Sequence, residues 1–244
     1  MEIEIQQFLN GLDHLFATGQ GQKAGIYLEE WLAKAEEASD INGTFTVLNE
    51  MMGYYRSTEQ EEKGISAATK CVMLIGQYGL QNHPAVGTMF LNIATTLCHF
   101  KRVEEAIDFY KRAEKSFSTY GANHFTMASL YNNMAFSYVQ KEEYYEAENS
   151  YKNALNLLEK VDGSNGEKAV TYANMIDLYK KSGQKEKAMD CVKKIQLSLK
   201  EENNIMDAKY ASACLKCANI LKAYGWLEEA RKLEERGNRI YEGT

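Results

Sequence analysis

Proline is almost absent from this chain, since Pro84 is the single proline among 244 residues. Proline lacks the backbone N–H that helices and strands need, so it gathers in loops and turns. With 45% hydrophobic residues and so little proline, the chain has little room for frequent loops. The composition therefore predicts a nearly all-helical protein.

Long hydrophobic runs and an excess of basic residues are also missing. No stretch approaches the ~18 apolar residues of a membrane span. The start MEIEIQQFLN has neither the basic residues nor the apolar run of a signal peptide. The net charge of -6 argues against nucleic acid, whose binding needs a basic surface to displace counterions. We therefore expect no membrane partner and no nucleic-acid partner.

The cysteine pattern fits neither a disulfide framework nor a metal site. Five cysteines are an odd number without framework spacing, which indicates the reducing cytoplasm. Cys214 and Cys217 form a CxxC, but no second pair of ligands completes a zinc site, and the strand–helix setting of a redox CxxC is lacking. We expect both thiols to lie in the core, and we expect no metal and no cofactor.

Catalytic motifs are missing too. The sequence has no glycine-rich phosphate loop, HExxH or GxSxG. His83 and His124 are 41 residues apart and immediately precede expected helices, so we interpret them as helix-entry residues. His99 has no serine or cysteine nearby on its helix face with the logic of a catalytic triad. The sequence indicates that the chain is not an enzyme and has no catalytic residues.

What the sequence does contain is an internal repeat. FLNIATTL (90–97), YNNMAFSY (131–138) and YANMIDLY (172–179) share an aromatic start and an asparagine before an apolar pair. An alanine follows each of these asparagines by fourteen residues, as from Asn133 to Ala147. The same frame extends in both directions with a period of about 41 residues. It predicts six repeats in a single domain over 1–244, at approximately 2–40, 41–81, 82–122, 123–164, 165–203 and 204–242.

Each repeat has the pattern of two amphipathic helices. In the first helix, apolar residues at spacings of three, one and three form one buried stripe. The third repeat shows it as Phe90, Ile93, Ala94 and Leu97. The second helix offers a stripe of alanine, tyrosine and alanine, whose small residues allow close packing. Because no repeat can bury both stripes alone, the repeats are expected to stack into an α-solenoid.

These residues resemble the tetratricopeptide repeat, in the long variant found in kinesin light chains and in many bacterial proteins. The order aromatic, apolar–small pair and Tyr or Leu, followed by Ala, Tyr and Ala, carries the resemblance. YGLQNHPAVGTMFLNIA (78–94) and YGANHFTMASLYNNMA (120–135) match the variant's Gly and His before a helix with Asn and Ala. The resemblance covers the whole chain. It implies an all-α, right-handed solenoid of six helix-turn-helix repeats with the first helices on the concave side.

A polar stripe lies opposite the buried stripe of each first helix. We call its central position the Asn site: Asn10, Glu50, Asn92, Asn133, Asn174 and Lys216. Positions four before, three after and seven after the Asn site fall within about 60° of it on the helix. This face is short of charge and rich in small residues, which is atypical of a helix face turned to water. On this stripe we expect a binding groove, formed by Asn10, Glu50, Thr88, Asn92, Thr95, His99, Ser129, Asn133, Phe136, Gln140, Asn174, Asp177, Lys181, Lys216 and Asn219.

An asparagine amide offers one acceptor and two donors, which match the C=O and N–H of an extended peptide. The family resemblance implies that Asn92, Asn133 and Asn174, and also Asn10, contact a peptide backbone. The alternative is that these amides cap or bridge neighbouring helices. Asn132 projects about 100° away from the stripe, so we expect it at a helix–helix contact.

The sequence thus predicts a cytoplasmic scaffold that holds a protein or peptide segment in its groove. Two alternatives stay open: a peptide-sensing regulatory module that acts on a separate partner, and a scaffold that uses its convex face. Charge within the groove differs along the chain, with Glu50 in the second repeat and Lys181 and Lys216 in the last two. We expect an acidic part of a ligand near these lysines, unless Asp177, one turn from Lys181, pairs with it.

Overall fold

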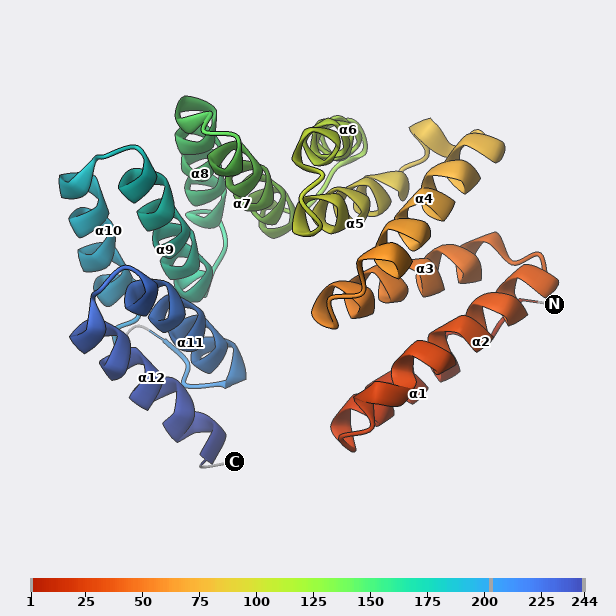
Figure 1. Ribbon diagram of the computed structural model, residues 1–244, viewed down its shortest axis with the longest axis horizontal. Helices are drawn as coiled ribbons and strands as arrows, with labels where there is room; N and C mark the ends of the chain where they lie inside the picture. The colour runs from red at the N-terminus through yellow and green to blue at the C-terminus, as the bar shows by residue number, and fades with distance from the viewer. Residues whose placement is uncertain (1, 202–203, 243–244) are drawn as a thin grey trace. The chain divides into compact units, whose positions relative to one another are not determined.

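The computed structural model describes residues 2–201 and 204–242. Within these residues the chain folds into twelve α-helices and two short 3-10 helices, without a β-strand (Figure 1). The predicted all-α solenoid class is confirmed. Residues 202–203, the end of the predicted fifth repeat, lie outside the described residues.

The chain divides into two compact units, Met1–Gly121 and Ala122–Thr244, which we call the N-terminal unit and the C-terminal unit. The helices of the N-terminal unit are α1 Ile5–Ala17, α2 Ala24–Glu37, α3 Ile41–Ser57, α4 Glu61–Gln77, α5 Val86–His99 and α6 Val103–Tyr120, with 3-10 helices η1 Gly21–Lys23 and η2 Leu80–Asn82. Those of the C-terminal unit are α7 His124–Gln140, α8 Tyr144–Leu158, α9 Asn165–Lys181, α10 Lys185–Ser198, α11 Ala208–Ala223 and α12 Leu227–Glu242. Each predicted repeat contains one consecutive pair of these α-helices. The period and the single continuous domain stay predictions.

The turn inside each helix pair contains one residue with a left-handed backbone. These residues are Gly19, Glu59, Lys101, Glu142, Gly183 and Gly225, with φ between 54° and 88°. A left-handed residue after a helix ends it and reverses the chain, and glycine adopts this conformation without strain. The turn between the two helices is therefore of the same type in every pair.

The predicted stripes form the core. In the second helices, Ala147, Tyr151 and Ala154 of α8 are all at most 1% exposed. In the first helices, Met175 and Ile176 of α9 are likewise buried. Small alanines let helices approach, while the tyrosine rings fill the space between neighbouring pairs.

Side-chain caps mark the starts of two first helices of the C-terminal unit. Asn123 accepts a hydrogen bond from the Thr126 N–H at 2.8 Å and begins α7 immediately before His124. Asp207 accepts one from the Tyr210 N–H at 2.9 Å and begins α11. Such caps satisfy N–H groups that the first helical turn leaves unpaired. The prediction that His124 lies at a helix entry is confirmed.

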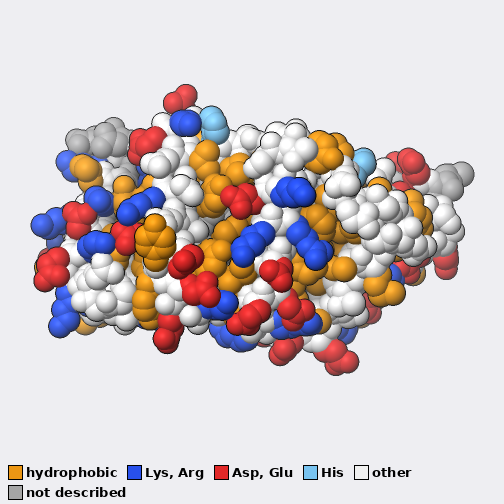
Figure 2. All heavy atoms as spheres, turned by 90° about the horizontal axis from the view of Figure 1, so that it is seen from above, with side chains coloured by type: hydrophobic (Ala, Val, Ile, Leu, Met, Phe, Trp, Pro, Cys, Tyr) orange, Lys and Arg blue, Asp and Glu red, His pale blue; other side chains and the backbone are white. Residues whose placement is uncertain are grey.

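Within the C-terminal unit, α7, α9 and α11 lie on the inner side and α8, α10 and α12 on the outer side (Figure 1). On the face shown in Figure 2, basic and acidic side chains are intermixed with apolar ones. Of the three first helices, α9 contacts both α7 and α11.

Candidate functional site

A cavity of about 1150 Å³ lies in the C-terminal unit, and α7, α9 and α11 form its walls. Each of these helices contributes its Asn site and the residue four positions earlier: Ser129, Asn133, Val170, Asn174, Ser212 and Lys216. Three repeats therefore place equivalent positions around one space. This is the part of the predicted stripe that the structure brings together.

The cavity extends beyond the predicted positions. Glu167 of α9 and Lys209 of α11 line it seven residues before their Asn sites, and Phe125 lines it at the start of α7. Seven residues are about two helical turns, so Glu167 and Lys209 continue the same stripe toward the N-termini of their helices. The sequence pattern contained this signal, but the predicted stripe began only four residues before the Asn site.

Loop residues complete the cavity. Asp162 lies in the α8–α9 connection, and Asn204 and Ile205 lie in the α10–α11 connection. No periodicity marks such residues, because helical spacing ends with the helix. Sequence reasoning therefore missed them.

The other predicted positions of the C-terminal unit do not line this cavity. Phe136, Gln140, Asp177, Lys181 and Asn219 follow the Asn sites, whereas the cavity occupies the N-terminal halves of the first helices. Asp177 forms an ion pair with Lys181 at 3.1 Å and accepts a hydrogen bond from the Tyr224 hydroxyl. The anticipated Asp177–Lys181 pair is thus present, and of the two predicted cationic positions only Lys216 lines the cavity.

In the N-terminal unit, two predicted asparagines have partners nearby. The Asn92 amide on α5 donates to Asn49 Oδ1 on α3 at 3.0 Å. Asn10 Oδ1 accepts from Gln6 Nε2 at 2.9 Å within α1. Asn92 thus bridges neighbouring helices, as the alternative interpretation of these amides foresaw. Contact of Asn10 and Asn92 with a peptide stays a prediction.

The remaining predicted residues of the N-terminal unit differ in environment. Glu50 is half-buried on α3, and burial, together with the charge of Asp13, raises the pKa of its carboxyl group. Thr88 is exposed, and the Thr95 hydroxyl donates to the Leu91 carbonyl at 2.8 Å. The remaining residue, His99, lies with its Nε2 3.1 Å from Glu59 Oε2. Their role in binding stays a prediction.

The adjacent asparagines Asn132 and Asn133 of α7 both line the cavity, but their contacts differ. The Asn132 amide donates to Thr171 Oγ1 on α9 at 2.9 Å and to the Ala128 carbonyl at 3.3 Å. It therefore forms the helix–helix contact that was predicted. Its Oδ1 is buried and has no hydrogen-bond partner among the described residues. Asn133, one residue later, is half-buried on the cavity wall.

Four charged side chains of the cavity lie on two different walls. Lys209 and Lys216 belong to α11, whereas Asp162 and Glu167 belong to α9 and the loop before it. In the part of the chain that the structure describes, none of the four forms an ion pair. The two lysines thus lie on one wall and these two carboxylates on another, and a third carboxylate that lines the cavity lies at the start of α11. A fifth charged residue, Asp207, caps α11.

Cys214 and Cys217 are fully buried, so their predicted core position is confirmed. Burial raises the pKa of both thiols, which disfavours the reactive thiolate. Over residues 2–201 and 204–242, no group of three or more His, Cys, Asp or Glu is placed to hold a metal ion. Within the same residues, no helix has the length and apolar character needed to cross a membrane.

Comparison with known proteins gives both a family match and similar structures. Residues 126–195 match the tetratricopeptide repeat model. No curated protein sequence matches the chain significantly.

Among solved structures, BtubC (BKLC) from P. vanneervenii is 20% identical, with 88% of this chain and 91% of that chain covered and a TM-score of 0.59. A putative kinesin light chain of Podosopora anserina with nearly identical TPR-like repeats is 13% identical, with 80% and 93% covered and a TM-score of 0.58.

NprR is a quorum sensor solved in its apo form from B. thuringiensis, and a structure of NprR in complex with its cognate peptide NprX is also known. The complex is 21% identical to this chain, with 95% of this chain and 65% of that chain covered and a TM-score of 0.62. Identities this low establish the fold alone. Residues 126–195 thus match the tetratricopeptide repeat, and the chain has the fold of the tetratricopeptide-repeat and kinesin-light-chain-like solenoids.

Proposed function

We propose that the chain is a binding protein, not an enzyme, and that it holds an extended peptide or protein segment in the cavity of the C-terminal unit. One observation carries this proposal. The helices α7, α9 and α11 each place the same two stripe positions, the Asn site and the residue four before it, on one cavity. A surface built once per repeat suits a ligand that itself repeats, and a polypeptide backbone is such a ligand.

The size and lining of the cavity support a peptide. Its volume of about 1150 Å³ lies above the roughly 300–1,000 Å³ usual for small-molecule sites. Small residues such as Ser129 and Gly166 line part of the wall, which leaves room for a peptide backbone to approach. The Asn174 amide supplies donors and an acceptor that fit a peptide unit.

The structural comparisons support the same class of ligand. NprR, which shares this fold, has been solved with its cognate peptide bound. The cytoplasmic location and the expectation that nucleic acid and membranes are not partners, both predicted from the sequence, are part of this proposal.

The test starts from a random peptide display library selected against the purified chain. Selected peptides are synthesised with a fluorescent label, and their affinities are measured by fluorescence polarisation. Asn174→Ala and Asn133→Ala should each weaken binding about two- to tenfold, as expected for one net hydrogen bond. Asn153→Ala is the matched control, because Asn153 is exposed on α8 and does not line the cavity.

Two results would contradict the proposal. One is a selection that yields no peptide with measurable affinity. The other is a set of peptides that bind the Asn174→Ala and Asn133→Ala variants as tightly as the unmodified chain, because such peptides use another surface.

A further inference from the structure

An exposed isoleucine stands at the edge of the cavity. Ile205 is 82% exposed, the highest value among the exposed large hydrophobic residues of the described chain, and it lines the cavity. Phe125, 45% exposed at the start of α7, lines the same cavity. Single exposed apolar residues are common and need no explanation. Two large ones on one cavity offer a place for an apolar side chain of a ligand.

The segment that carries Ile205 is tied to the helices around it. The Asn204 amide donates to the Ser198 and Lys200 carbonyls at 2.8 and 2.7 Å. On the other side of Ile205, Asp207 caps α11. Ile205 is therefore held at the cavity by polar contacts of its neighbours and not by burial of its own side chain.

Charge further restricts what the cavity accepts. Lys209 and Lys216 are seven residues apart, so they lie on one face of α11 about 10.5 Å apart along its axis. Glu167 and Asp162 lie on another wall. Without ion-pair partners in the described chain, these groups favour ligand charges of opposite sign on the two walls.

We propose that the ligand is an extended segment in which a large apolar residue stands beside an acidic residue and a basic residue. The apolar side chain packs against Ile205 and Phe125, the acidic side chain faces Lys209 and Lys216, and the basic side chain faces Glu167. Successive side chains of an extended chain point to opposite sides, so neighbouring acidic and basic residues reach opposite walls. This inference rests on the proposed peptide-binding function and specifies its ligand.

The experiment uses the same peptide library, selected in parallel against the unmodified chain and three variants. Against the unmodified chain, selected peptides should be enriched in Leu, Ile, Met or Phe next to an acidic and a basic residue. Ile205→Ser should reduce the apolar enrichment and weaken the selected peptides about tenfold, because the apolar side chain loses its contact with Ile205. Met189→Ser is the matched control, since Met189 is 52% exposed on α10 but does not line this cavity.

The third variant, Lys216→Glu, tests the charge. It should change the enrichment from acidic to basic residues and weaken acidic peptides more at low salt than at high salt. Suppose peptides bind through Asn174 but show no apolar or charge enrichment, and Ile205→Ser changes nothing. That outcome overturns this inference and leaves the proposed function standing. If no peptide is selected at all, both fail.

Discussion

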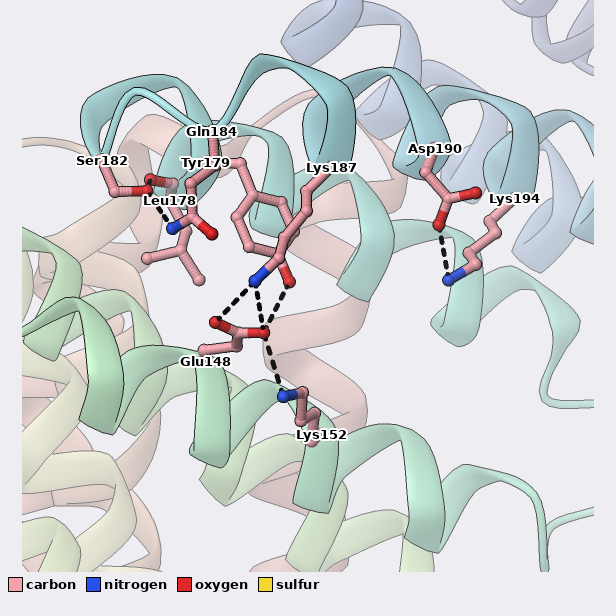
Figure 3. A network of polar contacts seen from close by, with 9 residues as sticks. All are labelled: Glu148, Lys152, Leu178, Tyr179, Ser182, Gln184, Lys187, Asp190 and Lys194. Atoms are coloured by element: carbon pink, nitrogen blue, oxygen red, sulfur yellow. Dashed lines mark hydrogen bonds and ion pairs between the residues drawn. The ribbon is translucent and has the colours of Figure 1, made fainter.

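The Tyr179 hydroxyl on α9 donates a hydrogen bond to the Glu148 carboxylate on α8 at 3.2 Å (Figure 3). Lys187 of α10 donates to the same carboxylate at 3.1 Å and lies 5.1 Å from the centre of the Tyr179 ring. Lys152 pairs with it at 3.0 Å. One carboxylate thus connects the fourth helix pair to both helices of the fifth.

The N-terminal unit contains the same arrangement. Tyr55 of α3 donates to Glu29 of α2 at 3.2 Å, and Lys63 of α4 donates to it at 2.8 Å and lies 5.6 Å from the centre of the Tyr55 ring. In both units the tyrosine and lysine are eight residues apart. At the equivalent position of the lysine, the third, fourth and sixth repeats have Glu105, Glu146 and Glu229, so they lack this cation. The contact is therefore a property of repeats two and five.

Removing the Tyr179 hydroxyl tests how much this contact stabilises the C-terminal unit. Tyr179→Phe keeps the buried ring and removes one donor to the Glu148 carboxylate, whose side chain is 19% exposed. We expect the free energy of unfolding to fall by about 0.5–1.5 kcal/mol, the net contribution of one hydrogen bond. Urea denaturation followed by circular dichroism measures it. Tyr145→Phe, at a tyrosine 75% exposed on α8, should change stability by less than about 0.5 kcal/mol.

The same carboxylate gives the stability a pH dependence. Burial alone raises the pKa of Glu148, but the hydrogen bonds and charges of Lys152 and Lys187 outweigh it, and the pKa is lowered from 4.5. Between pH 4.5 and the lower pKa that the Glu148 carboxyl group has in the folded chain, this group binds more protons in the unfolded chain. The stabilisation is therefore present above pH 4.5 and is lost as the pH falls through that window. Stability measured from pH 6 to pH 3 should fall less steeply for Glu148→Gln, and an unchanged slope would contradict this.

The buried hydrogen bond between Asn132 and Thr171 predicts a cost for a nearly isosteric change. Thr171 is fully buried, and Thr171→Val removes the hydroxyl that accepts from the Asn132 amide. The amide then keeps only its longer bond to Ala128. We expect the free energy of unfolding to fall by about 1–2 kcal/mol, because a buried donor loses a partner. Thr119→Val, at an exposed position of α6, should have little effect on thermal unfolding.

The turns inside the helix pairs predict changes of opposite sign. Glu142 has φ of 61° in the α7–α8 turn, whereas Gly183 has φ of 75° in the α9–α10 turn. Glu142→Gly relieves left-handed strain of about 1–2 kcal/mol but adds backbone entropy to the unfolded chain. We expect the free energy of unfolding to rise by up to about 1 kcal/mol. Gly183→Ala should lower the free energy of unfolding by about 1 kcal/mol, because alanine is strained in a left-handed backbone. No atom lies near the added methyl group, so no steric clash adds to this strain. Equal effects of the two changes in urea denaturation would contradict this.

Much of the fold follows from periodicity in the sequence. The spacing of three, one and three placed Phe90, Ile93, Ala94 and Leu97 in the core, and all four are buried. The same helical geometry placed Asn133, Asn174 and Lys216 on one face, and they line one cavity. A periodic pattern predicts these features because equivalent residues of each repeat pack against the neighbouring repeats in the same way.

Other features of the site depend on contacts that periodicity does not encode. Asn92 occupies the Asn site, yet its amide donates to Asn49, a neighbour in space that is 43 residues away in the chain. Ile205 reaches the cavity from a loop, where helical spacing gives no information. The position of the cavity along the helices likewise follows from how α7, α9 and α11 pack, so the stripe alone could not favour Glu167 over Asp177.

Glu50 provides the final prediction, with a pH dependence opposite to that of Glu148. Burial, and after it the charge of Asp13, raises the pKa of Glu50 above 4.5 in the folded chain. Between 4.5 and this higher pKa, the folded chain binds more protons than the unfolded chain, so stability falls as the pH rises. At pH 7 the ionised Glu50 therefore destabilises the N-terminal unit. Glu50→Gln, which has nearly the same helix propensity, should raise the free energy of unfolding at pH 7. The gain should disappear below about pH 4, where the carboxyl group is protonated in both states. Glu37→Gln at an exposed position of α2 is the control, and a loss of stability in Glu50→Gln at pH 7 would show that the ionised carboxylate makes a stabilising contact.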